Sequence, residues 1–319
     1  MTTSAAIPAA TAQPPRSLRR FAWGVLAYNV AVIVYGSAVR ATGSGAGCGD
    51  HWPLCNGTLV QHHPAITTLI EFAHRATSGV DLLCVLALFF WAFAAAQRRH
   101  AARACAVAVL VLTFNEALLG ALLVLLGHTA QDASPSRAVY LALHLTNTLL
   151  LLAALTLTAH FLSRRNDATR DHLTLRSPAL ALSGLIAILI VGVTGSLAAL
   201  GDTLYPARSL AAALAQDFAP GSSWLLRIRW VHPVASAVAG GFVVWLVYRT
   251  WKRVDRTGRP IALAVVLLLV LQILLGVADV TLLAPTWLQM SHLLGADLLW
   301  IALVILSARI CFVSKSNPA

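Results

Sequence analysis

The chain carries little charge for its length. Only 11% of its 319 residues are charged, whereas a soluble domain carries roughly 25%. The chain is also 58% hydrophobic, and its apolar residues are spread too evenly for one anchor on a soluble domain. The net charge of +11 does not indicate nucleic-acid binding, because the basic residues form short clusters between apolar runs and not one patch. The composition therefore predicts an integral membrane protein in contact with lipid.

The chain also has few long polar stretches. Eight apolar runs reach the roughly 20 residues that a helix needs to cross a bilayer. We therefore predict an all-α integral membrane protein with eight transmembrane helices. No small-residue cleavage site follows the first run, so we expect that run to be retained and not removed as a signal peptide. Residues 1–19, rich in Ala, Pro and Thr, are expected to form a disordered N-terminus. The predicted helices cover residues 20–40, 66–97, 103–127, 139–163, 178–201, 225–251, 259–283 and 286–312.

Lysine and arginine are unevenly divided between the two sides of this arrangement. Seventeen of the 23 lie at the ends of the chain or in the connections after the second, fourth and sixth runs. Positively charged connections stay in the cytoplasm, so both termini are predicted to be cytoplasmic. The connections after the first, third, fifth and seventh runs then face outward.

The chain contains an internal repeat. Thr42-Gly43-Ser44 at the end of the first run matches Thr194-Gly195-Ser196 in the fifth, and Leu118-Leu119-Gly120 in the third run matches Leu274-Leu275-Gly276 in the seventh. Each half has an even number of spans, which predicts two four-helix bundles related by a pseudo-two-fold axis along the membrane normal. Chance similarity among Leu- and Gly-rich helices is the alternative. The predicted division is a first half, 20–163, a cytoplasmic linker, 164–177, a second half, 178–312, and a cytoplasmic tail, 313–319.

Four of the eleven histidines lie inside even-numbered runs, six to nine residues from the outer end of each helix. At 1.5 Å per residue this places them about 9–14 Å deep. An ionisable residue inside the membrane is a functional hypothesis by default, although a lone histidine can also be a packing residue. Facing imidazoles in a helix bundle can hold haem, whereas zinc or copper would need further ligands that are missing at this depth. We predict two bis-histidine haem sites, formed by His74, His144, His232 and His292.

The other seven histidines are expected to be solvated.

The two halves differ one turn before the first histidine of each. Glu71 precedes His74 by three residues and shares its helix face, whereas Arg229 takes this place before His232. A carboxylate beside a haem edge can act as a base or proton relay, so we predict Glu71 as the catalytic residue. The alternative is that Glu71 only forms an ion pair with a nearby arginine. The predicted partners of haem propionates are Arg40, Arg75 and Arg229.

Two of the five cysteines, Cys48 and Cys55, lie in the first outer connection within a glycine-rich segment. Their spacing allows a small ring to close, and a disulfide persists in an oxidising compartment. Three roles remain open: a structural disulfide, a redox-active or haem-handling pair, and a zinc pair without an obvious full ligand set. The remaining cysteines are expected to be inert packing residues.

Together these residues resemble the haem A synthase family, the cytochrome oxidase assembly proteins that convert haem O to haem A. The resemblance extends from about residue 20 to 312. Its most specific parts are VRATGSG at 39–45, DHWPLCNG at 50–57 and EFAHR at 71–75, in this order and with the four histidines on even-numbered helices.

The resemblance implies roles that residue spacing does not show. His74 and His144 would hold the substrate, haem O, and His232 and His292 would hold a haem b cofactor. Glu71 would be needed for turnover, in which one porphyrin methyl group is oxidised to a formyl group through a hydroxymethyl intermediate. The resemblance also implies the bacterial inner membrane as location, and a haem O synthase and cytochrome oxidase assembly factors as partners. Some relatives carry a second cysteine pair in the third outer connection, which this chain lacks.

Two other classes fit parts of the pattern. A b-type electron-transfer cytochrome would share the four histidines but would not require Glu71 beside one haem. A transporter could share the internal repeat, although no matching pair of helices broken by Gly or Pro at mid-membrane depth supports it. The sequence leaves open the electron partner, the oligomeric state, the route of haem O entry, and whether water or dioxygen supplies the oxygen atom.

Overall fold

A computed structural model describes residues 13–58, 63–164, 173–175 and 178–314. Within them, eight helical segments are long and apolar enough to cross a membrane, which confirms the predicted multi-pass α-helical class. Their ends lie within four residues of the predicted ones. The spans are α1 (Arg16–Ala41), α2 (Ile66–Ala95), α3 (Ala101–Leu125), α4 (Pro135–Ser163), α5 (Pro178–Leu204), α7 with α8 (Trp224–Ile228 and Val231–Thr250), α9 (Arg259–Thr281) and α10 (Thr286–Cys311).

Within the described residues, five short elements lie outside the spanning helices. Among them is α6 (Leu210–Phe218) in the third outer connection, where we had predicted no helix. The others are two 3-10 turns, η1 (Ser44–Ala46) and η3 (Trp251–Arg253), and an antiparallel pair of three-residue strands, β1 (Leu173–Leu175) and β2 (Phe312–Ser314).

The predicted terminal and linker segments are partly outside the described residues. The helix α1 begins at Arg16, so the last residues of the predicted disordered N-terminus are helical, and residues 1–12 lie outside the description. Parts of the predicted linker and tail form β1 and β2, and residues 165–172, 176–177 and 315–319 lie outside it as well.

Local chemistry explains where several helices begin or break. The Ser134 side chain accepts the backbone N–H of Arg137 and Pro135 occupies the first turn, so α4 begins four residues earlier than predicted. The break between α7 and α8 follows from Pro233, which has no N–H to donate to the carbonyl of Arg229 one turn earlier. This break places Arg229 in a turn at the outer end of the span.

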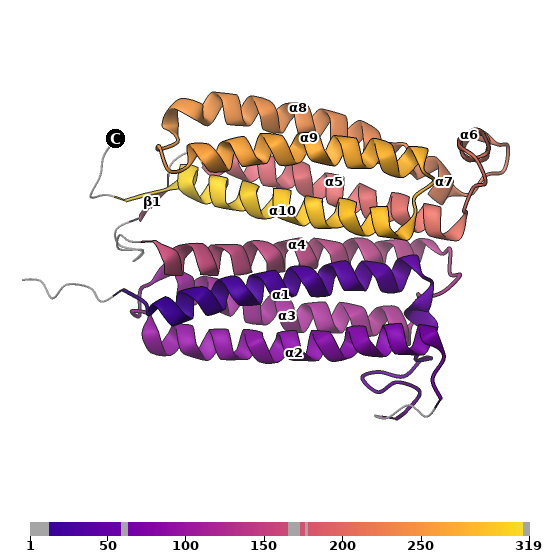
Figure 1. Ribbon diagram of the computed structural model, residues 1–319, viewed down its shortest axis with the longest axis horizontal. Helices are drawn as coiled ribbons and strands as arrows, with labels where there is room; N and C mark the ends of the chain where they lie inside the picture. Colours follow the sequence, from indigo (N-terminus) through magenta and orange to yellow (C-terminus); the bar gives the residue numbers. More distant parts are fainter. Residues whose placement is uncertain (1–12, 59–62, 165–172, 176–177, 315–319) are drawn as a thin grey trace, which may run out of the picture.

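The spanning helices lie side by side in two groups (Figure 1). One group contains α1, α2, α3 and α4, and the other contains α5, α8, α9 and α10. The groups meet along a seam where α4 packs against α5 and α10, and α1 packs against α10. Leu152, Leu155, Leu303 and Leu306 are fully buried there or beside it, and the Trp300 indole N–H donates to the Leu149 carbonyl across the seam at 2.8 Å. A pseudo-two-fold relation between the groups stays a prediction.

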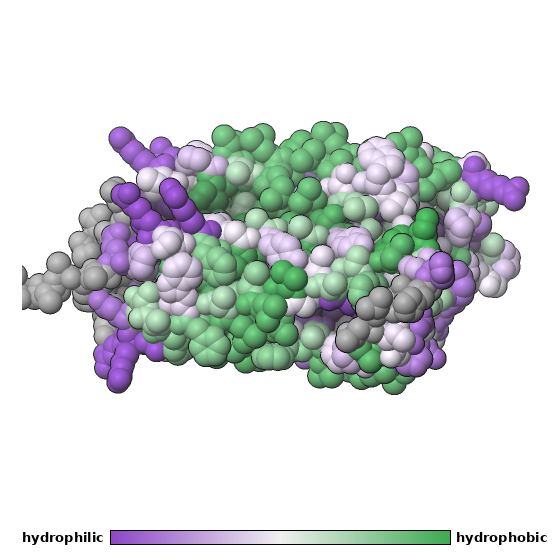
Figure 2. All heavy atoms as spheres, turned by 60° about the horizontal axis from the view of Figure 1, so that its bottom comes forward, coloured by the Kyte–Doolittle hydropathy of each residue, from purple (hydrophilic) through white to green (hydrophobic). Residues whose placement is uncertain are grey.

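The surface is divided as a bilayer requires. Figure 2 shows hydrophobic side chains around the middle of the molecule and hydrophilic ones gathered at its two ends. Large apolar residues such as Phe90, Val238 and Leu274 are more than 60% exposed on helix faces away from the core. Lipid tails cover such faces without cost, while the helices satisfy their own backbone hydrogen bonds.

Two of the histidines that we expected to be solvated are buried. His100 precedes α3 and accepts the backbone N–H of Ala102 at 3.2 Å, and His160 packs beside Phe161 near the end of α4. His100 lies at the start of α3 and His160 near the end of α4. These are the ends of the two helices that lie away from Gly120 and His144.

Candidate functional site

The four predicted site histidines share one structural arrangement. Each ring lies over a glycine of a neighbouring helix: His74 over Gly36, and His232 over Gly195. A Cβ atom added to Gly36 or Gly195 would lie 3.0 or 2.9 Å from the Cε1 atom of its histidine. His144 and His292 lie over Gly120 and Gly276 in the same way, with corresponding distances of 3.8 and 3.4 Å. The missing side chain at each glycine therefore makes the space in which an imidazole ring lies.

The structure brings the two histidines of the second pair together. The ring centroids of His232 and His292 are 6.4 Å apart, and the two ring planes are nearly perpendicular, at 88°. The Nδ1 atom of His232 lies 3.2 Å from the Val191 carbonyl oxygen, so it carries the proton and leaves Nε2 as the free electron-pair donor. This arrangement fits bis-histidine coordination of an iron porphyrin.

Three of the four site histidines have a ring nitrogen without a hydrogen-bond partner within the described residues. The Nδ1 atoms of His74, His144 and His292 are buried and make no hydrogen bond there. Tyr35 lies edge-on to His74, with ring centroids 5.8 Å apart. Buried nitrogen atoms of this kind are costly unless a ligand or water satisfies them, and three such rings among the four intramembrane histidines make a binding site the simplest explanation.

The structure corrects the register of the internal repeat in the first and fifth spans. Thr42 lies at the end of α1 and Ser44 in η1, whereas Thr194-Gly195-Ser196 lies inside α5. The equivalent pair is instead Gly36-Ser37 with Gly195-Ser196, 159 positions apart, because both glycines support a histidine and both serines bond the carbonyl three residues earlier. The match of Gly120 with Gly276 is consistent with the structure. The sequence match of Thr-Gly-Ser was wrong by seven residues, or about two helical turns.

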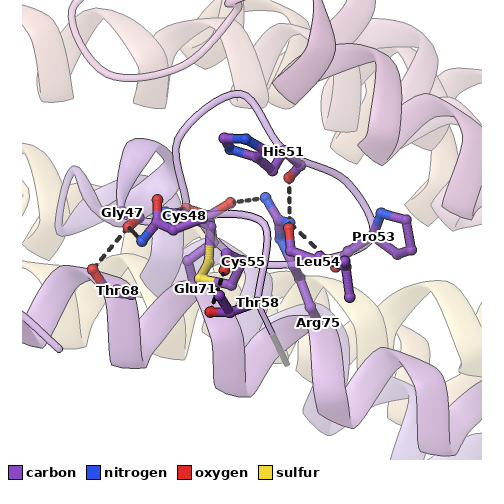
Figure 3. The surroundings of a disulfide bond; sticks show 11 residues. Gly47, Cys48, His51, Pro53, Leu54, Cys55, Thr58, Thr68, Glu71 and Arg75 are labelled. Atoms are coloured by element: carbon purple, nitrogen blue, oxygen red, sulfur yellow. Dashed lines mark hydrogen bonds and ion pairs between the residues drawn. A yellow bond between two sulfur atoms is a disulfide. The ribbon is translucent and has the colours of Figure 1, made fainter. Parts of the chain in front are cut away.

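Glu71 is buried and faces the first outer connection (Figure 3). Its Oε2 atom accepts the backbone N–H of Cys48 at 2.8 Å, and its Oε1 atom pairs with Arg75 at 2.6 Å. Arg75 in turn donates to the carbonyl oxygens of His51 and Leu54. Cys48 and Cys55 form a disulfide within this loop. The ion pair that we considered as the alternative for Glu71 is therefore present, and the carboxylate also holds the disulfide loop on α2.

The other two predicted propionate partners make contacts inside the protein. Arg40 extends from α1 across the seam and donates to the Ala199 carbonyl, the Thr203 hydroxyl and Gln289. Arg229 pairs with Asp202 at 2.7 Å and with Asp217 of α6, and so ties the third outer connection to α5. Both guanidinium groups lie near the outer ends of the helices, but their role toward a haem stays a prediction.

One residue near the histidines was not predicted as part of the site. Glu116 of α3 lies with its Oε1 atom 3.5 Å from the Nδ1 atom of His144 on α4. Its carboxylate also accepts hydrogen bonds from Asn147 and Thr148. The sequence contained a signal for this residue. Glu116 lies one turn before Gly120, and the segment around Gly120 is repeated around Gly276.

Fold and site together define a multi-pass membrane protein with four histidines inside its helices, each lying over a glycine of a neighbouring helix. The family model COX15-CtaA, described as a cytochrome oxidase assembly protein, matches residues 19–304. The chain therefore belongs to the COX15-CtaA family of cytochrome oxidase assembly proteins.

Individual relatives carry two different names. A protein of Thermus thermophilus named protoheme IX farnesyltransferase is 44% identical over 291 residues, which are 91% of this chain and 48% of that protein. The chain thus spans about half the length of this relative. A haem A synthase of Alkalihalophilus pseudofirmus is 38% identical over 126 residues, 40% of each chain. A haem A synthase of Listeria monocytogenes is 27% identical over 311 residues, 92% of this chain and 96% of that protein.

Proposed function

We propose that the protein is a haem A synthase, which oxidises a methyl group of haem O to a formyl group through a hydroxymethyl intermediate. The observation that carries the proposal is the arrangement of four intramembrane histidines, each lying over a glycine, two in each half of the chain. Family membership supports it, as do relatives of that name that match nearly the full chain or parts of it.

The two halves are proposed to hold different haems. His74 and His144 would bind haem O as the substrate, and His232 and His292 would bind haem b as the resident cofactor. An iron porphyrin in the second site supplies one-electron redox chemistry. The protein contributes the ring orientation of the ligands through the glycine contacts, and apolar helix surfaces around them.

Glu71 is proposed to accept a proton from the substrate side. It lies one turn before His74 and is the buried carboxylate that distinguishes the first site from the second, where Arg229 takes the corresponding place. With water as the oxygen source, each conversion of methyl to formyl releases four protons and four electrons, and an external acceptor takes the electrons. Incorporation of labelled oxygen from dioxygen and not from water would contradict this route.

The proposed location is a bacterial inner membrane, with both termini in the cytoplasm and the disulfide loop outside. The proposed partner is a haem O synthase, which would deliver an apolar substrate within the bilayer. The Thermus protein supports this partnership, because a protein that carries the name of a farnesyltransferase acting on protohaem includes a segment similar to this chain.

The test is the identity of the pigment that the protein makes. The wild type and the variants Glu71→Ala and Glu71→Gln would be purified from a host that makes haem O, and the extracted porphyrins identified by chromatography and mass. We expect haem b and haem A from the wild type, and haem O or its hydroxymethyl form from both variants, because loss of a general base lowers the rate by roughly a hundredfold or more.

The Glu71→Gln variant distinguishes the proposed role of Glu71 as a proton acceptor from its role in holding the disulfide loop. Its amide oxygen can still accept the Cys48 N–H that holds the disulfide loop, whereas it cannot accept a proton as a carboxylate does. Full haem A production by Glu71→Gln would restrict Glu71 to the structural role. If the wild type yields haem b alone, the protein is better described as an electron-transfer cytochrome.

A further inference from the structure

The two halves differ in the residue that accompanies the second histidine of each pair. Glu116 lies four residues before Gly120, and Gln272 lies four residues before Gly276. Since these glycines lie under His144 and His292, Glu116 and Gln272 occupy equivalent places on α3 and α9. The first half therefore has a carboxylate where the second has a neutral amide.

Both side chains extend toward the same point of the neighbouring helix. Glu116 accepts hydrogen bonds from Asn147 and Thr148, three and four residues after His144. Gln272 lies against Gly295, three residues after His292, where even a Cβ atom would meet its amide nitrogen. The two positions thus correspond in location as well as in sequence.

The contact to histidine distinguishes them. The Oε1 atom of Glu116 lies 3.5 Å from the Nδ1 atom of His144, a nitrogen that makes no hydrogen bond within the described residues. Two donors from α4 fix the carboxylate at this place, so a small rotation of the imidazole would complete an Nδ1–H to carboxylate hydrogen bond. For the second pair, the structure shows no ion pair between His292 and a carboxylate within the described residues.

We propose that Glu116 is a positioning residue that orients His144 and increases its electron donation to iron, and that the exchange of Glu116 for Gln272 gives the two haem sites different reduction potentials. The inference rests on the proposed function, since it requires iron porphyrin at both histidine pairs. When the Nδ1–H group of a metal-bound imidazole donates a hydrogen bond to a carboxylate, the imidazole becomes a stronger electron donor. A stronger donor stabilises ferric iron relative to ferrous iron. The first site then has the lower potential, and electrons from the substrate pass downhill to the second.

The matched variants are Glu116→Gln and Gln272→Glu, each of which gives one site the residue of the other. The full-length proteins would be purified in detergent and loaded with iron protoporphyrin IX, and their two midpoint potentials measured by optical redox titration. We expect Glu116→Gln to shift the reduction equilibrium of one haem about threefold to tenfold toward the ferrous form, tenfold being 59 mV for one electron. Gln272→Glu should shift the other haem in the opposite direction.

The control is Thr113→Val, one turn before Glu116, whose hydroxyl donates a hydrogen bond to the Val109 carbonyl of its own helix. It should leave both potentials unchanged. If neither Glu116→Gln nor Gln272→Glu changes a potential although two haems are bound, the positioning role is contradicted while the proposed function stands. If the wild type binds no iron porphyrin, the proposed function fails. If Glu116→Gln misfolds and binds no haem, the midpoint potential of the Gln272→Glu variant still tests the proposal. An unchanged potential in that variant would contradict it.

Discussion

At the scale of single residues, the glycines under the histidines carry as much information as the histidines themselves. An imidazole inside a packed helix bundle needs a space of its own volume, since protein interiors leave few voids. At Gly36, Gly120, Gly195 and Gly276, the absent side chain provides this space at four places in the bundle. A glycine inside a helix costs about 0.5–1 kcal/mol relative to alanine, so its repeated use indicates that the ring position matters.

Gly195→Ala should disturb haem binding without disturbing the fold. The added Cβ atom would lie 2.9 Å from the Cε1 atom of His232 and would push the ring out of its place. We expect the affinity of the second site for iron protoporphyrin IX to fall about tenfold or more, as is typical when a metal ligand loses its orientation. The measurement is a titration of the purified protein followed by absorbance.

Gly241→Ala is the control for this variant. Gly241 lies in α8, and nothing lies within 4 Å of the place where its Cβ would be. Both variants gain helix propensity, so only the contact with His232 distinguishes them. Equal haem affinity in the two variants would show that the glycine contact does not orient the ring.

At the scale of elements, the outer connections are fixed by polar side chains at helix ends. The loop before α4 is an example outside the membrane. Burial alone would raise the pKa of Asp132, but hydrogen bonds from the Ser134 backbone and hydroxyl groups and from His128 outweigh it and hold this pKa below its ordinary value. The ionised form of Asp132 thus stabilises the loop that caps α4.

This loop should lose stability on acidification. A carboxyl group whose pKa is lower in the folded protein contributes stability above its unfolded pKa of about 3.9, and the contribution is lost as the pH falls through the lower, folded value. Thermal unfolding of the wild type in detergent should therefore show a decrease in Tm below about pH 4. In Asp132→Asn this decrease should be smaller, and an unchanged pH profile would contradict the role of Asp132.

Elements also differ in how far sequence patterns predicted them. The apolar runs gave the long helices to within four residues, because burial in lipid requires each span to be a continuous helix. The same criterion missed α6, which lies outside the apolar runs and is tied to the bundle through the ion pair of Asp217 with Arg229. It also missed the break before Val231, although Pro233 was visible.

At the scale of the whole molecule, the charge pattern and the fold agree on which connections share a side. In Figure 1 the described ends of the chain lie at one end of the bundle, and α6, α7 and the disulfide loop lie at the other. Arg40 joins α1 to α5 and α10 across the seam near this outer end. The two groups of helices are thus joined by polar contacts at this end of the bundle as well as by the apolar seam.

The proposed orientation predicts which side of the membrane each connection faces. Arg208 and Arg256 are both exposed arginines, one before α6 and one before α9. In a chain whose three cysteines outside the disulfide are replaced by serine, Arg208→Cys should react with an impermeant thiol reagent added outside intact cells, and Arg256→Cys only after the membrane is opened. The reverse pattern would overturn the orientation derived from the positive charges.

The sequence by itself determined the membrane class, the eight spans and the four histidines, because hydrophobic length and intramembrane polar residues are local properties that one chain displays without its fold. It also singled out Glu71 and the cysteine pair, which lie on adjacent segments of the chain. Only the tertiary structure decided which glycine lies under which histidine, the true register of the repeat, and the contacts of Glu116 and Arg40. These depend on how helices rotate and slide against one another, and packing between helices sets that geometry where the pattern along each helix does not.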